Sequence, residues 1–203
     1  MRPRRIVVPV AVARDEIPGL RHTQWLWHNL RAMTIGELRE AQTPLKERYR
    51  SNSEAALITL TAEGRIGEHV TCKIDTAKGS IEAGLHPASG GPGSFACSGD
   101  MLLEALAACA GVTLSAVATA IGVELRGGTV RAEGVFDFRG TLGVSKEAQV
   151  GFQNIRLAFD LDTDADPEQL ATLRKFTERY CVVFQTLRQP PALELSIKSS
   201  VLT

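Results

Sequence analysis

Two cysteines in helix-like surroundings, Cys109 and Cys181, are the candidate reactive side chains of this sequence. Cys109 lies within EALAACAGVTLSAV, where small neighbours let another segment approach its sulfur closely, and Cys181 lies in ERYCVVFQTL. Thiolate is the nucleophilic form of cysteine. An apolar helix would raise the pKa of the Cys109 thiol, so a reactive Cys109 needs a cation nearby. Composition alone favours a different interpretation, in which Cys109 is only a packed core residue.

The other cysteines and the histidines do not suggest a second reactive site. Cys72 alternates with Val70 and Ile74, which favours a place in the core of a sheet, and Cys97 lies in a glycine-rich loop. No cysteine pair has C-x-x-C spacing and no Cys/His cluster has zinc-ligand spacing, so we expect neither a metal nor a cofactor. The four histidines are scattered along the chain: His22, His28, His69 and His86.

The sequence supports neither a phosphate-binding loop nor a hydrolase triad. The GGPG stretch at 90–93 precedes a predicted helix, but it lacks the lysine of a P-loop and the spacing of a dinucleotide fingerprint. No serine lies in an elbow motif, so a hydrolase triad has no support. We interpret the glycine-rich segment as a loop that leads into the helix.

Composition places the protein among ordinary globular chains. Its 203 residues are 44% hydrophobic, and the 23 Lys and Arg residues balance the 23 Asp and Glu residues. A net charge of zero does not call for a nucleic acid or an anionic membrane as partner. Four cysteines do not make a disulfide-dense secreted scaffold, so the expected location is a reducing cytoplasm.

The N-terminus differs in character from the rest. MRPRRIVVPVAVARDE has a basic start and a short apolar run at 6–13, features of a signal peptide, but Pro9 interrupts the run. We therefore expect residues 1–32 to be a loosely attached extension. The folded domain is expected to span residues 33–203.

The first half of the domain predicts helix and then sheet. Thr34 and Glu37 have the spacing of a capping box at the start of a polar helix, and Pro44 could begin a second helix. Three β-rich segments follow, with GRIG as a turn between the first two, and they predict an antiparallel meander: 55–62, 68–76 and 80–86.

A long apolar helix is expected over residues 101–121. Ser98 or Asp100 is its candidate N-cap, and Gly122 is expected to end it. It is apolar on nearly all sides, which indicates a buried helix, and its apolar faces exceed what one small sheet can cover. A membrane span is the alternative, which Glu104 and the many small residues disfavour. We therefore expect a second subunit to cover part of it.

The last third predicts two long strands, a helix and a closing strand. The strands at 129–140 and 149–164 alternate, with a break near Gln153 and Asn154 that suggests a β-bulge. Asp166 and Pro167 begin a helix at 167–180, and 192–198 is expected to be the last strand. Because strands cluster and do not alternate singly with helices, the fold class is α+β.

Three segments together resemble the OsmC/Ohr family of thiol-dependent peroxidases. They are GLHPASGGPGSFACSGDMLLEALAACAGVTL, VGFQNIRLAFDLDTD and LRKFTERYCVVFQTL, and the resemblance covers about residues 54–198. It implies an OsmC-like fold of antiparallel sheets around a long buried central helix, in an intertwined homodimer with sites at the subunit interface. It also implies reduction of organic hydroperoxides or hydrogen peroxide, with an external thiol as reductant, as part of an oxidative stress response.

The resemblance assigns roles to particular residues. Cys109 would be the peroxidatic thiol and Cys181 the resolving thiol. The family uses an arginine held by a glutamate, for which Arg65 is the best match and Arg48 and Arg50 are the alternatives. The loop at 86–91 carries no carboxylate where the Ohr branch has its glutamate, and Val182 replaces a proline. The competing function is a non-catalytic dimer that binds a small apolar ligand or senses oxidant.

Overall fold

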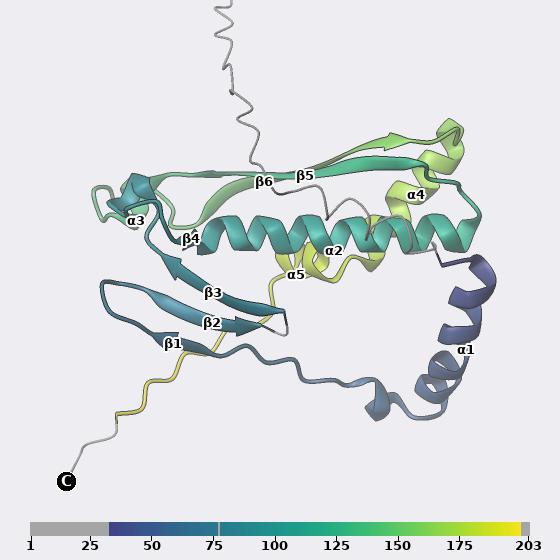
Figure 1. Cartoon of the computed structure of the whole chain (residues 1–203), viewed down its shortest axis with the longest axis horizontal. Coiled ribbons are helices and arrows are strands. Elements are labelled where there is room, and N and C mark those ends of the chain that lie inside the picture. The colour runs from purple at the N-terminus through teal and green to yellow at the C-terminus, as the bar shows by residue number, and fades with distance from the viewer. Residues whose placement is uncertain (1–32, 77, 200–203) are drawn as a thin grey trace, which may run out of the picture. The chain divides into compact units, whose positions relative to one another are not determined.

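The computed structural model describes residues 33–76 and 78–199, so the predicted extension and signal-like run at 1–32 lie outside the described residues. Figure 1 shows the order of the elements. The helices are α1 (Ile35–Ser51), α2 (Ser98–Ile121), α3 (Phe138–Thr141), α4 (Pro167–Tyr180) and α5 (Val182–Arg188), with 3-10 turns at Ser53–Ala56 and Pro87–Ser89. The strands are β1 (Gly64–Ile66), β2 (Cys72–Thr76), β3 (Gly79–Gly84), β4 (Ala96–Cys97), β5 (Gly127–Phe136) and β6 (Phe152–Asp162). The α+β class is confirmed.

The first sheet has the strand order β1-β2-β3-β4. β1, β2 and β3 form the predicted antiparallel meander, while the short β4 joins β3 in parallel. The first strand lies at β1, within the GRIG stretch expected to be a turn, and not at 55–62. Residues 57–63 are not in a strand, and Leu57 and Leu60 are 80% and 89% exposed. β-propensity alone cannot form a strand that has no neighbour to pair with.

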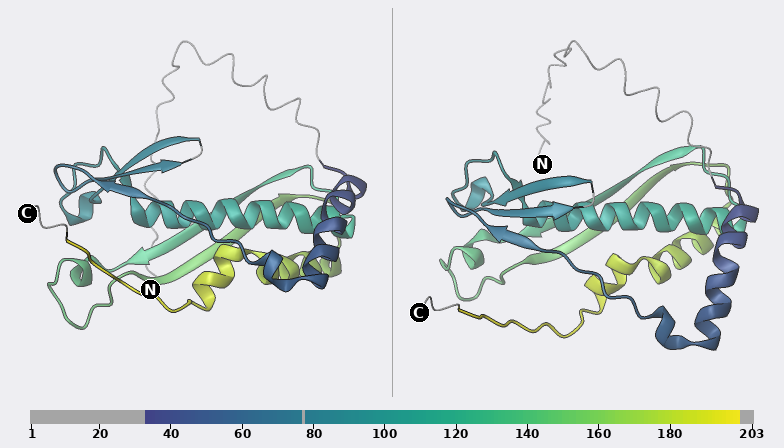
Figure 2. Two further views of the ribbon diagram at one scale, coloured as in Figure 1. Left: turned by 90° about the horizontal axis from the view of Figure 1, so that it is seen from below. Right: turned by 60° about the horizontal axis from the view of Figure 1, so that its bottom comes forward.

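β5 and β6 form a long antiparallel ribbon. Their register pairs Val135 with Asn154 and Phe136 with Phe152, which leaves Gln153 as the extra residue of a bulge. The break predicted from the sequence near Gln153 is therefore confirmed. Figures 1 and 2 show α2 running alongside this ribbon.

α2 supplies one side of the core. It begins at Ser98, earlier than expected, and its N-cap is Cys97, which makes no side-chain capping bond, so neither Ser98 nor Asp100 is the cap. Gly122 ends the helix as predicted, in the left-handed conformation at φ 75°. α2 packs against α4, α5 and β5. Its buried residues follow helical spacing along one face: Leu106, Ala110, Leu114, Val117 and Ala118.

The opposite face of α2 is apolar and open to solvent, where Ala105, Ala108 and Val112 are exposed, Val112 to 72%. By length and composition, α2 is the one helix within the described residues that could cross a membrane, a test that core helices of globular proteins also pass. Leu114, Val117 and Ala118 belong to the hydrophobic core, together with Val123 and Leu173. α2 is therefore the core helix of this fold.

α4 and α5 follow the sequence-based expectation closely. Asp166 caps α4 in a capping box with Gln169, and Pro167 occupies the first turn. Cys181 has an extended backbone and ends α4 while it begins α5. Leu173 and Thr177 form the buried face of α4.

The two ends of the described chain depart from expectation. Thr34 and Glu37 form the predicted capping box, but α1 continues through Pro44 as one helix, with no buried residue along it. The expected last strand at 192–198 is absent from the described residues, where this segment carries no strand. Leu193, Leu195 and Ile197 alternate along it and are about 90% exposed. Figure 2 shows the segment leaving α5 as an extended trace.

Candidate functional site

Cys109 and Cys181 lie side by side. They are 72 residues apart in the sequence, yet the Cys181 thiol donates to the Cys109 sulfur across 3.5 Å. Cys109 is half-buried within α2, and Cys181 is 1% exposed at the junction of α4 and α5. The fold thus brings together the two cysteines singled out from the sequence.

Small residues and helix packing create this approach. Ala110, beside Cys109, is fully buried, and α2 contacts both α4 and α5. Leu173 is 1% exposed and fixes α4 in the core. Because the chain turns at Cys181 from one helix into the next, its side chain and the first amides of α5 both face Cys109.

The pKa of the Cys109 thiol is lowered from its ordinary value. Burial raises it, but several hydrogen bonds to the sulfur outweigh burial. They come from the backbone N–H of Val183, the Cys181 thiol, the backbone N–H of Val182 and the Thr113 side chain. The pKa of Cys109 is thus lowered by amides at the start of α5 and by neighbouring side chains, where the sequence had led us to expect a cation.

The pKa of the Cys181 thiol is raised. Burial is the main cause, and the neighbouring Cys109 sulfur raises it further, while the backbone N–H groups of Phe184 and Val183 act in the opposite direction. The two sulfurs are therefore unequal. Cys109 loses its proton at a lower pH than Cys181, so Cys109 is the thiol that more readily forms the nucleophilic thiolate.

Arg65 lies on β1 and forms an ion pair with Asp75 of β2. Its side chain is 64% exposed, and within the described residues it makes no hydrogen bond or ion pair with Cys109. Arg48 and Arg50, the alternatives, lie in the last turn of α1. A single chain therefore places Arg65 in the first sheet, beside a carboxylate.

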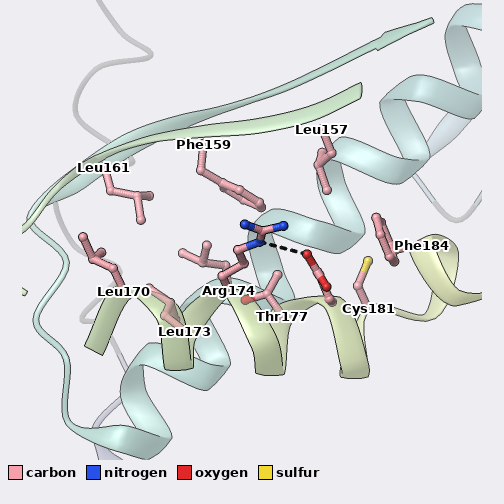
Figure 3. Close-up of a pocket in the computed structure, with 11 residues that line it drawn as sticks. Leu157, Phe159, Leu161, Leu170, Leu173, Arg174, Thr177, Cys181 and Phe184 are labelled. Atoms are coloured by element: carbon pink, nitrogen blue, oxygen red, sulfur yellow. Dashed lines mark hydrogen bonds and ion pairs between the residues drawn. The ribbon is translucent and has the colours of Figure 1, made fainter. Parts of the chain in front are cut away.

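An apolar cavity of about 370 Å³ adjoins Cys181, one member of the thiol pair (Figure 3). It runs between β6 and α4 and ends at Cys181 and Phe184. Arg174 and Glu178 line it and form an ion pair, with Arg174 Nε 3.0 Å from Glu178 Oε1. The remaining lining residues are Leu114, Leu157, Phe159, Leu161, Leu170, Leu173 and Thr177.

This cavity was not predicted from the sequence. Leu170, Arg174, Thr177 and Cys181 have the spacing of one face of α4, and this signal was available in the sequence. The part of the wall that comes from β6 could not be read from the sequence, because it depends on how the β5–β6 ribbon packs over α4. Cavity residues from two elements can be grouped only once their packing is known.

The other cysteines and the histidine considered in the sequence, Cys72, Cys97 and His86, lie in strands or make local contacts. Cys72 lies on β2 and Cys97 at the end of β4, both half-buried. His86 accepts a hydrogen bond from the Ala88 amide and stacks on Phe138, with ring centroids 5.1 Å apart. Across residues 33–76 and 78–199, no group of His, Cys, Asp and Glu is arranged to hold a metal ion.

A family model described as OsmC-like protein matches residues 91–196, more than half of the chain. The matched region contains both thiols of the pair. The chain belongs to the OsmC-like protein family. No curated protein matches this OsmC-like chain.

Solved structures show the same fold at low sequence identity. An OsmC-like protein from Mycoplasma pneumoniae matches with a TM-score of 0.56 and 15% identity, over 66% of this chain and 89% of the other. A hypothetical protein from Aquifex aeolicus matches with a TM-score of 0.52 and 16% identity, over 66% and 90% of the two chains. An organic hydroperoxide resistance protein from Elizabethkingia anophelis matches with a TM-score of 0.52 and 13% identity, over 66% and 91%. The OsmC-like fold predicted from the sequence is therefore confirmed.

Proposed function

We propose that this OsmC-like protein reduces peroxides through Cys109 and Cys181. The observation that carries the proposal is the 3.5 Å separation of two sulfurs whose pKa values are shifted in opposite directions. Two idle core cysteines would need neither the close approach nor a balance of burial and hydrogen bonds that lowers the pKa of one thiol and raises that of the other. The fold shared with an organic hydroperoxide resistance protein supports this choice.

The proposed reaction begins at Cys109. Its thiolate attacks the terminal oxygen of a hydroperoxide ROOH, the O–O bond breaks, and the alkoxide takes up a proton to leave as the alcohol ROH. Cys109 is oxidised to a sulfenic acid. The sulfur of Cys181 then attacks the Cys109 sulfur, a disulfide forms, and the hydroxyl leaves as water with the Cys181 proton.

The geometry suits the second step because the two sulfurs already lie 3.5 Å apart. A disulfide bond is about 2.05 Å long, so its formation needs only a small movement of the α4–α5 junction. An external thiol returns the disulfide to two thiols by exchange through a mixed disulfide. We expect this to take place in the cytoplasm.

Arg65 remains our candidate for the arginine that assists Cys109, reaching it across the interface of a homodimer. Its exposed side chain and its ion pair with Asp75 support this role. Asp75 would replace the glutamate that the loop at 86–91 lacks, since either carboxylate can hold a guanidinium in place. The peroxide would then approach Cys109 from the side of α2 that one chain leaves open.

The second candidate function is a dimeric protein that binds a small apolar ligand or senses oxidant without turnover. The apolar cavity beside Cys181 favours it. The two functions differ in what one equivalent of peroxide does to the thiols. In the enzyme it converts both within one catalytic cycle, and an added dithiol reverses the change.

A single-turnover experiment tests the proposal. Reduced protein receives one equivalent of tert-butyl hydroperoxide, and mass spectrometry of its peptides locates the oxidised cysteines. We expect a Cys109–Cys181 disulfide in the wild type and a dimedone-trapped sulfenic acid on Cys109 in Cys181→Ser. Oxidation spread equally over Cys72, Cys97 and Cys109 would contradict a dedicated site.

A further inference from the structure

The cavity between β6 and α4 contains a buried hydroxyl group without a partner. Thr177 is 3% exposed and lines the cavity, and its Oγ1 makes no hydrogen bond to any residue in the described part of the chain. Figure 3 shows its side chain pointing into the cavity between Leu173 and Cys181. Leaving a buried hydroxyl unpaired is costly, so such a group indicates that something else supplies its partner.

The shape and lining of the cavity describe that partner. Leucine and phenylalanine side chains from both elements make most of the wall, with Leu161 and Leu170 at the end away from the thiols. A volume of about 370 Å³ lies near the lower limit of cavities that hold small ligands. An apolar body of modest length would fill it, with its one polar group beside Thr177.

The charges at the cavity favour an uncharged molecule. Arg174 and Glu178 are the charged side chains that line it, and they form an ion pair of zero net charge in which the Arg174 side chain is 81% exposed. A carboxylate on the ligand would meet Glu178 as well as Arg174, and an ammonium group would meet Arg174 as well as Glu178. A charged ligand of either sign would therefore meet a like charge as well as an opposite one, and its binding would not be favoured.

We propose that this cavity binds an uncharged molecule with an apolar chain and one terminal hydroxyl group, and that Thr177 recognises the hydroxyl by a hydrogen bond. The apolar chain lies along α4 toward Leu161 and Leu170. Its hydroxyl end lies close to Cys181, since Cys181 ends α4 four positions after Thr177 and donates its backbone N–H to the Thr177 carbonyl across 3.0 Å. The binding does not depend on peroxide turnover.

Calorimetric titration of the reduced full-length protein with 1-octanol tests the proposal in the absence of peroxide. We expect saturable binding of 1-octanol, and weaker binding of octanoate, which carries the same chain on a charged group. Absence of binding up to the solubility of 1-octanol, or tighter binding of octanoate, would overturn the proposal. A failure of peroxidase activity would leave this result unchanged.

Variants of Thr177 separate recognition from packing. Thr177→Val keeps the shape and removes the hydroxyl, so 1-octanol affinity should fall about three- to tenfold, the range expected for one neutral hydrogen bond. The unliganded variant should melt at or above the wild-type temperature, because valine removes an unpaired buried oxygen. Thr177→Ser should retain binding, as should Thr172→Val, a control on α4 outside the cavity. Equal affinity in Thr177→Val and wild type would overturn the role of the hydroxyl.

Discussion

The asymmetry between Cys109 and Cys181 arises from backbone geometry as much as from side chains. Cys109 accepts hydrogen bonds from the first amides of α5, and Cys181 is buried more completely. The same junction that buries one thiol therefore activates the other. The junction between α4 and α5 therefore sets the environment of both sulfurs.

The opposite pKa shifts predict different pH profiles for alkylation. The thiolate is the reactive form, so the rate of iodoacetamide labelling rises with pH through each thiol's pKa. Because the pKa of Cys109 is lowered and that of Cys181 raised, Cys109 should reach half-maximal reactivity at the lower pH. Labelling rates for Cys181→Ser and Cys109→Ser, each followed by mass spectrometry, measure the two midpoints. The reverse order would refute the assignment of roles.

At the scale of elements, α4 positions Cys181, and its start is fixed by Asp166. The Asp166 side chain accepts from the Gln169 amide at 2.8 Å, and the Gln169 side chain accepts from the Asp166 amide at 3.0 Å. Asp166→Ala should lower the free energy of unfolding by about 1 kcal/mol, the usual value of an N-cap. Chemical denaturation measures this change.

Thr34→Ala supplies the matched control for that cap. Thr34 and Glu37 form the same kind of capping box, but α1 buries no residue and can fray without unfolding the core. We therefore expect a much smaller loss of global stability in Thr34→Ala. Equal losses in the two variants would mean that α1 is as strongly coupled to the core as α4.

Local signals in the sequence were enough for some elements and not for others. Asp166–Pro167, Gly122 and the register break at Gln153 each act within a few residues, and each prediction held. The strands expected at 55–62 and 192–198 depend on a neighbouring strand, which the described chain does not supply. The same limit applies to the site, because the resemblance paired the thiols but only the packing of β6 on α4 revealed the cavity.

At the scale of the whole molecule, several apolar surfaces are exposed within the part of the chain that the structure describes. They include Val112 on α2, Leu57 and Leu60 after α1, and the alternating residues at 193, 195 and 197. Alternation with a period of two is the pattern of a strand with one buried face. We propose that a second copy covers these surfaces in a homodimer, with 192–198 pairing as a strand.

The dimer predicts the mass of two chains by light scattering at micromolar concentration. Leu195→Asp places a charge on the proposed buried face of the C-terminal strand and should shift the population toward monomer or toward aggregates. Glu194→Asp, on the other face of that segment, should leave the dimer intact. A wild-type protein that is stably folded as a monomer would contradict this proposal.

Residues 1–32 are proposed to be an extension outside the folded domain. A chain that starts at Met33 should keep the wild-type circular dichroism spectrum and oligomeric state, because the hydrophobic core found within residues 33–76 and 78–199 is built around α2 and α4. Thermal melting of the truncated protein checks this expectation. An insoluble or unfolded product would show that the domain includes the N-terminal segment.

The rate of tert-butyl hydroperoxide consumption, with dithiothreitol in excess, tests the central claim most directly. Wild-type protein should consume peroxide catalytically, and Cys97→Ser should do so at a similar rate, because Cys97 lies at the end of β4 and outside the thiol pair. Cys109→Ser should fall to the rate measured without protein, since the attacking sulfur is gone. If wild type and Cys109→Ser consume peroxide at the same rate, the protein is not a peroxidase that works through this thiol pair.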